Sequence, residues 1–224
     1  MLPRRGQRDR TSRLRLVRSF FKTDERDEGG PIRSPFVVGL GNPGRSYERT
    51  RHNAGYLVAD ELAKRHDGSW RKRKKAEAAP VSLGIYNATL LKPTTFMNNT
   101  GSAVSDHRPE NLIVVHDDLD LEAGTVRVKV GGGAGGHNGL RSIIGRLGND
   151  FVRVRIGIGR PPAGVTVTDY VLSRMDSVVK DAIPRAADAV EFVVGERLRQ
   201  INHGIRVRFS WIGAAALSVP KVLE

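Results

Sequence analysis

Residues 36–55 read FVVGLGNPGRSYERTRHNAG, and this stretch decides the fold. Residues 36–40 form a short apolar run, which is typical of a strand that is buried on both faces of a sheet. The glycines and the proline of GNPG follow at once and predict a sharp turn. Within residues 53–65, Val58 and Leu62 lie at helical spacing. A strand, a turn and a helix in this order indicate an α/β architecture.

The rest of the chain continues to alternate strand and helix patterns. Apolar or alternating runs predict two strands within residues 80–93 and one strand each within residues 112–115, 125–130 and 151–158. Helical spacing predicts a helix around residues 140–147 and a last helix over 182–201, with Pro184 in its first turn or kinking it. We therefore expect a single α/β domain, in which a mixed β-sheet is flanked by helices in three layers.

Composition changes near both ends of the chain. Residues 1–34 are rich in arginine and polar residues, and we expect a basic, mostly disordered extension with a short amphipathic helix possible over 14–21. The domain is expected to cover 35–203, and 204–224 to form an atypical tail. The arginine-rich start is also typical of an organelle import sequence. We expect a cytoplasmic protein, with organellar import as the alternative.

The overall composition excludes several kinds of protein. The 224 residues include no cysteine, so disulfides, thiolate nucleophiles and zinc–thiolate sites are excluded. Hydrophobic residues make up 39% of the chain, which is enough for a core. No apolar run approaches the roughly 20 residues of a membrane-spanning helix, and no secretory signal is visible. We therefore expect no membrane partner.

The net charge indicates the kind of partner. The chain carries a formal charge of +13, which favours a polyanionic partner. Residues 64–75 read KRHDGSWRKRKK and hold seven lysines or arginines against one aspartate. Such a patch binds phosphates without regard to sequence. A solvated basic loop without a partner is the simpler alternative.

Polar residues gather where the predicted strands end. Asn42, Tyr47, His52 and Asn53 follow the first strand. The triplet 116–118 (His-Asp-Asp) follows the apolar run 112–115, and the triplet 96–98 (Phe-Met-Asn) follows the strand that ends near Lys92. In open α/β sheets, ligands bind beyond the carboxyl ends of the strands. These residues are therefore the first candidates for a functional site.

A glycine-rich run lies between the strand at 125–130 and the helix at 140–147. It reads GGGAGGHNG over residues 131–139 and contains the spacing of a dinucleotide-binding loop. No acidic residue lies about twenty positions beyond it, because position 156 is isoleucine. The run is better explained as a loop that brings backbone N–H groups, His137 and Asn138 to an anionic or ribose-bearing ligand. A mobile surface loop remains the simpler alternative.

His52 is the strongest candidate for a titrating group, because a carboxylate at a neighbouring strand end, Asp117, could orient it. A His–Asp pair acts as a general base. The chain has no cysteine and no G-x-S-x-G elbow, so the nucleophile is expected to be water. Asn42, Asn98 and Asn138 could hold a carbonyl or an oxyanion. Metal ligation is the rival explanation, although H-x-x-x-H spacing and thiolates are absent.

Five blocks in order resemble the bacterial-type peptidyl-tRNA hydrolases. They are FVVGLGNPGRSYERTRHNAG, KPTTFMN, VVHDDLDL, GGGAGGHNGLRSI and RVRIGIGRP, and the match runs over residues 36–200. The resemblance implies hydrolysis of the ester between a peptide and the 3′-terminal ribose of tRNA. It implies no metal or organic cofactor, and it suggests a monomer that acts on tRNA.

The resemblance also implies roles for single residues. His52 matches the catalytic base, Asp117 its orienting carboxylate, and Asn42 the amide that distinguishes N-blocked from free aminoacyl esters. Residues implied to contact the tRNA end or the peptide are Tyr47, Phe96, Met97, Asn98, His137 and Asn138. Lys129 and Arg155 match basic positions that clamp tRNA phosphates. Arg45, Arg49 and Arg51 are expected to give the loop a cationic rim for RNA.

The chain departs from this family between Asn98 and His116, where the family has a longer helix. We expect this shortening to cost stability and to affect the placement of Asn98 or Asp117. The departure, the extension and the tail motivate a second hypothesis, a non-catalytic RNA-binding relative such as an intron-splicing facilitator. A third hypothesis is a nucleotide-dependent enzyme that uses the glycine-rich run.

Overall fold

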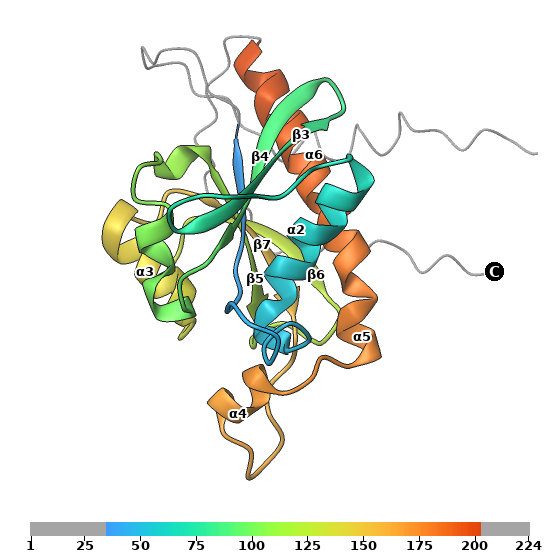
Figure 1. Cartoon of the computed structure of the whole chain (residues 1–224). Coiled ribbons are helices and arrows are strands. Elements are labelled where there is room, and N and C mark those ends of the chain that lie inside the picture. Colours follow the sequence, from blue (N-terminus) through green and yellow to red (C-terminus); the bar gives the residue numbers. More distant parts are fainter. Residues whose placement is uncertain (1–34, 203–224) are drawn as a thin grey trace, which may run out of the picture.

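The computed structural model describes residues 35–202 (Figure 1). The predictions for the extension 1–34, its helix over 14–21 and its import function lie outside these residues, as does the prediction for the tail 204–224. Within the described residues a single mixed sheet of seven strands is flanked by helices, which confirms the predicted fold class.

The apolar run at residues 36–40 forms the central strand of the sheet. The strand order is β2-β3-β4-β1-β5-β7-β6, and β1 (Phe36–Gly39) pairs in parallel with β4 and β5. Val37 and Val38 are completely buried, because helices cover both faces of this strand. The other strands are β2 (Arg71–Lys72), β3 (Ala76–Leu83), β4 (Tyr86–Pro93), β5 (Leu112–Asp118), β6 (Val126–Val130) and β7 (Val152–Gly157).

Four neighbouring strands, β4, β1, β5 and β7, run parallel, so their carboxyl ends meet at one edge of the sheet. Two strands are longer than predicted. The β3–β4 hairpin begins at Ala76 rather than near Pro80. β5 continues through Asp118, because His116 and Asp117 still pair with β7. The predicted polar triplet therefore stands on the rigid end of a strand, not in the loop beyond it.

Helices cover the two faces of the sheet separately (Figure 1). One face packs against α2 (Ala54–Arg65) and α6 (Ala182–Asn202), and the other against α3 (Asn138–Leu147) and the 3-10 helix η2 (Met97–Ala103). Shorter elements are η1 (Arg51–Asn53), η3 (Pro109–Asn111), α4 (Val167–Leu172) and α5 (Ser177–Lys180). Pro184 lies in the first turn of α6, as predicted. No helix within residues 35–202 has both the length and the hydropathy needed to cross a bilayer.

The shortened segment after Asn98 is compact. η2 packs on α3, where the backbone N–H of Gly101 donates to Ser142 Oγ at 2.9 Å. Val104 is completely buried, and the ring of His107 stacks on Phe36 with their centroids 3.9 Å apart. The segment therefore covers its face of the sheet with one 3-10 helix and a stacked ring. The expected loss of stability stays a prediction.

Two glycines allow α2 to lie directly on the sheet. A Cβ on Gly39 would fall 2.3 Å from the carbonyl oxygen of Gly55, and a Cβ on Gly55 would fall 2.3 Å from the carbonyl oxygen of Val115. Only a residue without a side chain permits such close backbone approach. Because His52 lies three residues before Gly55, this packing fixes the distance of His52 from the end of β5.

We expect Gly55→Ala to lower the free energy of unfolding by about 1–3 kcal/mol, because the added methyl group must push α2 away from β5. Gly145→Ala is the matched control, since Gly145 also lies in a helix but a Cβ there meets nothing within 4 Å. The control should stabilise the protein by up to about 1 kcal/mol. Urea unfolding of both variants measures the difference. Equal stabilities would show that the close approach is not required.

Candidate active site

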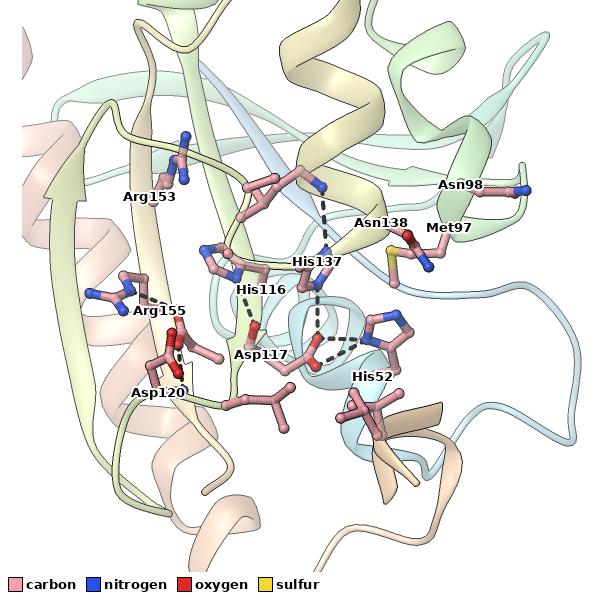
Figure 2. A pocket seen from close by; sticks show the side chains of 18 of the residues that line it. His52, Met97, Asn98, His116, Asp117, Asp120, His137, Asn138, Arg153 and Arg155 are labelled. Carbon is pink, nitrogen blue, oxygen red and sulfur yellow. Dashed lines mark hydrogen bonds and ion pairs between the residues drawn. The ribbon is translucent and has the colours of Figure 1, made fainter. Parts of the chain in front are cut away.

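A cavity of about 540 Å³ opens at the carboxyl ends of β1, β5 and β7. Its walls come from the loop after β1, the start of η2, the end of β5, strands β6 and β7, the glycine-rich loop before α3, and α4. Figure 2 shows His52 and Met97 on one side of this cavity, Arg153 and Arg155 on the other, and Asp117 and His137 between them. The predicted polar clusters therefore meet in one place.

His52 and Asp117 form a buried pair, although 65 residues separate them in the sequence. His52 Nδ1 lies 3.0 Å from both carboxylate oxygens of Asp117. The exposed fractions of the two residues are 9% and 3%. Because an ionised carboxylate only accepts hydrogen bonds, Nδ1 carries the proton. The other ring nitrogen, Nε2, is left to act as an acceptor.

Asp117 also holds a second imidazole. His137 Nε2 lies 3.1 Å from Asp117 Oδ1, and His137 Nδ1 accepts from the backbone N–H groups of Gly139 and Leu140. His137 therefore caps the N-terminus of α3 with one nitrogen and donates to Asp117 with the other. The hydrogen bonds at both nitrogens fix its tautomer and its ring orientation.

Asp117 and His52 shift each other's pKa values. Burial alone would lower the pKa of His52, but the charge of Asp117 and its hydrogen bond raise the pKa above the ordinary value. Burial would raise the pKa of Asp117, yet the two histidines hold it well below its usual range. Asp117 therefore stays ionised, and an ionised carboxylate increases the basicity of the imidazole it contacts.

Three hydrogen bonds fix Asn42, and its side-chain Nδ2 remains available to the cavity. Its backbone N–H donates to Asn53 Oδ1 at 2.9 Å, and its carbonyl accepts from Asn53 Nδ2 at 2.9 Å. Its side-chain oxygen accepts the backbone N–H of Met97 at 2.8 Å. These bonds fix the amide plane and leave Nδ2 as a donor. Asn53, which is 1% exposed, thus positions Asn42 without reaching the cavity itself.

Cations stand on the cavity side of β6 and β7. Lys129 pairs across the strands with Arg153, and Arg155 with Arg127. Arg155 Nε donates to Asp118 Oδ2 at 2.7 Å, and Arg153 donates to the carbonyls of Gly132 and Gly133. Burial and the neighbouring Arg155 lower the pKa of Arg153 to about 10. Like charges placed opposite each other on strands are destabilising, so an anionic ligand here would relieve their repulsion.

His116 lies beneath this cationic wall. It is 1% exposed, and its Nδ1–H donates to the backbone carbonyl of Asp117 at 2.8 Å. Burial and the nearby His137 lower the pKa of His116 to about 3, so the ring is neutral. Its edge-to-face packing on His137, with centroids 5.2 Å apart, supports the ring that donates to Asp117.

Apolar side chains close the opposite side. Phe96 is 58% exposed, and the ring of Tyr47 meets it edge-on at 6.3 Å between centroids. Val167, Val171 and Leu172 of α4 complete this wall. The cavity is thus cationic on one side, apolar on the other, and polar at its centre.

Arg51 ties α4 to the loop that carries His52. Its guanidinium donates to Ser173 Oγ at 2.5 Å, to the carbonyl of Arg174 at 2.8 Å and to Asp176 at 2.9 Å, and it lies over the ring of Tyr170. Its side chain is only 12% exposed. The expectation that Arg51 belongs to a cationic rim for RNA is therefore wrong, because these inward contacts occupy the guanidinium.

Comparison with known proteins identifies the family. The family model described as peptidyl-tRNA hydrolase matches residues 36–208. A peptidyl-tRNA hydrolase of Rubrobacter xylanophilus is 69% identical over 159 residues, which cover 71% of this chain and 92% of that protein. The chain belongs to the peptidyl-tRNA hydrolase family.

Other relatives agree with this assignment to the family. A peptidyl-tRNA hydrolase of Mycobacteroides abscessus is 46% identical over 171 residues, covering 70% of this chain and 87% of that protein. The crystal structure of a peptidyl-tRNA hydrolase from Acinetobacter baumannii is 33% identical, with a TM-score of 0.66 over 79% of this chain and 97% of that one. The predicted resemblance to this family is therefore confirmed.

Most residues predicted for the site line the cavity. Those that do are Asn42, His52, Phe96, Met97, Asn98, Asp117, Lys129, His137, Asn138 and Arg155. Tyr47 lies behind Phe96 instead. Asn98 and Asn138 are exposed at the rim, and Asn138 Oδ1 accepts from Arg141 at 2.9 Å. The shortened segment therefore leaves Asn98 and Asp117 at the same cavity.

Sequence reasoning missed α4 and the tether made by Arg51. The sequence does contain a local signal for α4, because Thr166 caps the helix by accepting from the N–H of Asp169. Nothing local indicates that this helix lies beside residues more than 110 positions earlier.

His52, Asp117 and His137 could also be considered as metal ligands. One potential ligand atom of each lies within 4.8 Å of the others. His52 Nδ1 and His137 Nε2 each hydrogen-bond to Asp117, and the remaining nitrogen of His137 is used by the start of α3. The geometry therefore favours a proton-bearing cluster over a metal site.

We expect Asp117→Asn to lower the pKa of His52 below its ordinary value of about 6.5. The substitution removes the attraction that raises this pKa, whereas the burial that lowers it remains. Titration of the imidazole signals by NMR measures the change. His107 serves as the control, because burial lowers its pKa and it stacks on Phe36 at the amino-terminal end of β1. An unchanged His52 would show that another group sets its pKa.

We expect Arg51→Ala to speed amide hydrogen exchange in residues 167–176 by at least about tenfold, since the tether of α4 is lost. Arg45→Ala, which removes an exposed arginine of the same loop, should leave this exchange unchanged. Mass spectrometry of exchanged peptides measures both. The same protection in the two variants would contradict the tether.

Proposed function

We propose that this chain hydrolyses the ester that joins a peptide to the 3′-terminal ribose of tRNA, with His52 as the general base. Membership of the peptidyl-tRNA hydrolase family supports the reaction. The observation that carries the residue assignment is the contact of His52 Nδ1 with both oxygens of buried Asp117 at 3.0 Å. This contact leaves a basic nitrogen at the wall of a large cavity.

In the proposed first step, His52 Nε2 takes a proton from a water molecule while the water oxygen attacks the ester carbonyl. Asp117 stabilises the imidazolium that forms, as a carboxylate does in other His–Asp pairs. The carbonyl becomes a tetrahedral oxyanion. The side-chain amides of the rim residues Asn98 and Asn138 are donors available to it.

In the second step, the intermediate collapses and the bond to the ribose 3′-oxygen breaks. The His52 imidazolium returns its proton to this leaving oxygen, so the base is regenerated. The products are a free peptide carboxylate and a tRNA with a free 3′-hydroxyl. No covalent enzyme intermediate is required, and within residues 35–202 no serine hydroxyl hydrogen-bonds to a histidine.

The walls of the cavity suit the two halves of such a substrate. We assign Lys129 and Arg155 to the phosphates near the terminal ribose, because both line the cationic side. Phe96, backed by Tyr47, and Met97 lie on the side suited to the acyl group. Asn42 Nδ2 is positioned to recognise a blocked, amide-bearing aminoacyl group.

A non-catalytic RNA-binding role is not favoured, since binding alone requires neither a buried His–Asp pair nor a raised histidine pKa. The cytoplasmic location and the monomeric state stay predictions.

The first test is turnover of N-acetyl-aminoacyl-tRNA by the parent protein and by His52→Ala. We expect the variant to lose at least about 10²-fold in kcat, the lower range for removal of a general base. Its tRNA affinity should be retained, because the cationic wall is unchanged. Full activity in the variant would exclude His52 as the base.

The second test concerns Asn42. Asn42→Asp keeps an oxygen that can accept the Met97 N–H, removes the Nδ2 donor and adds a negative charge. We expect the ratio of kcat/KM for N-acetyl-aminoacyl-tRNA to that for free aminoacyl-tRNA to fall at least about tenfold, as one lost hydrogen bond to substrate would cause. If the ratio is unchanged, recognition of the blocked amine lies elsewhere.

A further inference from the structure

The glycine-rich loop between β6 and α3 leads directly into two residues of the site. Residues 131–136 hold five glycines, and His137 and Asn138 follow them. His137 donates to Asp117, and Asn138 lies at the cavity rim, where we propose it as a donor to the oxyanion. The path of the loop therefore sets where both side chains lie.

Side-chain packing does little to hold this loop. A Cβ built on Gly133, Gly135 or Gly136 would meet nothing within 4 Å, so these glycines border open space. Ala134 provides the one side chain of residues 131–136, and it packs against the core. Glycine also loses more conformational freedom on ordering than any other residue. A loop of this composition keeps a single path only if its backbone is held by hydrogen bonds.

Backbone hydrogen bonds fix the two ends of the loop. The N–H of Gly131 donates to the carbonyl of Phe151 at 3.0 Å. The N–H of His137 donates to the carbonyl of Ala134 at 2.9 Å. The middle of the loop is held differently, by a side chain of β7.

That side chain is Arg153, whose two terminal nitrogens donate to the carbonyls of two successive glycines. Nη1 donates to Gly133 at 2.6 Å, and Nη2 donates to Gly132. A guanidinium presents its donors in a planar fork, so one side chain can hold two carbonyls with little further loss of freedom. Arg153 thus bridges the part of the loop that backbone hydrogen bonds leave free.

Arg153 is itself fixed in place. It is 3% exposed, and its guanidinium carbon lies over the ring of Phe151, 4.8 Å from the ring centroid. Phe151 is buried in the core on the same side of the sheet. The fork is therefore anchored to the sheet at one end and to the loop at the other.

The charge of Arg153 has no carboxylate partner. Among residues 35–202 no acidic side chain forms an ion pair with it, and its Nε has no hydrogen-bond partner there. Arg155, two residues on, pairs with Asp118. Burying an unpaired charge is costly, and a well-packed apolar side chain is often at least as stable in such a place. Stability alone therefore does not explain an arginine at this position.

We infer that Arg153 is a positioning residue of the proposed reaction. By bridging two carbonyls of the glycine-rich loop, it holds His137 against Asp117 and keeps Asn138 at the cavity rim. This inference rests on the proposed function for the reaction that the loop serves, whereas the contact itself is a property of the fold. The role differs from that of the cations assigned to phosphates.

Two other roles for Arg153 make different predictions. If it were one more cation for phosphate, its charge alone would matter, and a lysine would replace it. If it only stabilised the fold, its loss would lower the unfolding midpoint and leave kcat of the folded protein unchanged. Two variants separate these roles: Arg153→Lys keeps the charge and loses the fork, and Arg153→Met loses both.

Amide hydrogen exchange tests the contact without turnover. We expect exchange in residues 131–139 to speed up at least about tenfold in both variants, because the loop loses its central tether. Arg127→Lys is the matched control, since it makes the same change on the same face of the neighbouring strand β6. The control should leave this exchange unchanged. Unchanged exchange in Arg153→Lys, which retains the charge and is the milder change, would overturn the inference.

The ring of His137 gives a second readout that does not depend on hydrolysis. In the parent, Nε2 donates and Nδ1 accepts, so NMR of the ring nitrogens should show one fixed tautomer. In both Arg153 variants we expect signals averaged between tautomers. His66, which pairs with Glu191 between α2 and α6, should be unchanged. A His137 spectrum identical to that of the parent would contradict the positioning role.

Kinetics distinguish positioning from charge. With N-acetyl-aminoacyl-tRNA we expect kcat to fall at least about tenfold in both variants, because displacements of about 1 Å in a site cause losses of this size or more. KM should stay close to that of the parent, since Lys129 and Arg155 are unchanged. Each variant is assayed below its own unfolding midpoint, so a loss of folded protein does not contribute. A normal kcat in Arg153→Lys would overturn the inference.

Binding of uncharged tRNA over a salt series completes the test. A phosphate contact by Arg153 would reduce the logarithmic salt slope of Arg153→Met by about one. We expect both variants to keep the slope of the parent. A reduced slope in Arg153→Met would assign the charge to phosphate and overturn the inference. If the parent itself failed to hydrolyse the ester, the proposed function would fail, while exchange and the His137 tautomer would still test the contact.

Discussion

The whole site depends on one buried carboxylate that accepts hydrogen bonds from two imidazoles. Asp117 is 3% exposed and would be costly to ionise there without His52 and His137. In turn, the two rings are oriented by this single charge, one from the loop after β1 and the other from the start of α3. Removing the carboxylate would therefore disturb the base, its tautomer and the helix cap together.

The backbone makes this arrangement rigid. Asp117 stands on a strand residue that is paired with β7, and α2 is pressed onto β1 and β5 at two glycines. Asn53 bonds twice to the backbone of Asn42, so the turn after β1 cannot rotate independently of the helix that follows. The reacting groups thus come from rigid elements, which is how a site retains its geometry without substrate.

Local patterns predicted six of the seven strands and the three longest helices, but not β2, α4 or α5. They also predicted the His52–Asp117 pair, because strand ends in an α/β sheet converge. They could not predict contacts set by tertiary packing. The arginine of the RHN motif looks like a solvent-facing cation, yet Arg51 bonds to residues 122–125 positions away. The second hydrogen bond to Asp117 was missed for the same reason, since His137 reaches it only through the path of the glycine-rich loop.

The most direct test of the central claim is the pH dependence of kcat/KM for N-acetyl-aminoacyl-tRNA between about pH 5.5 and 8. A general base must lose its proton to work, and Asp117 raises the pKa of His52. The rate should therefore fall with decreasing pH along a single ionisation whose midpoint lies above about 6.5. A rate independent of pH in this range, or a midpoint below that value, would contradict a base made by His52 and Asp117.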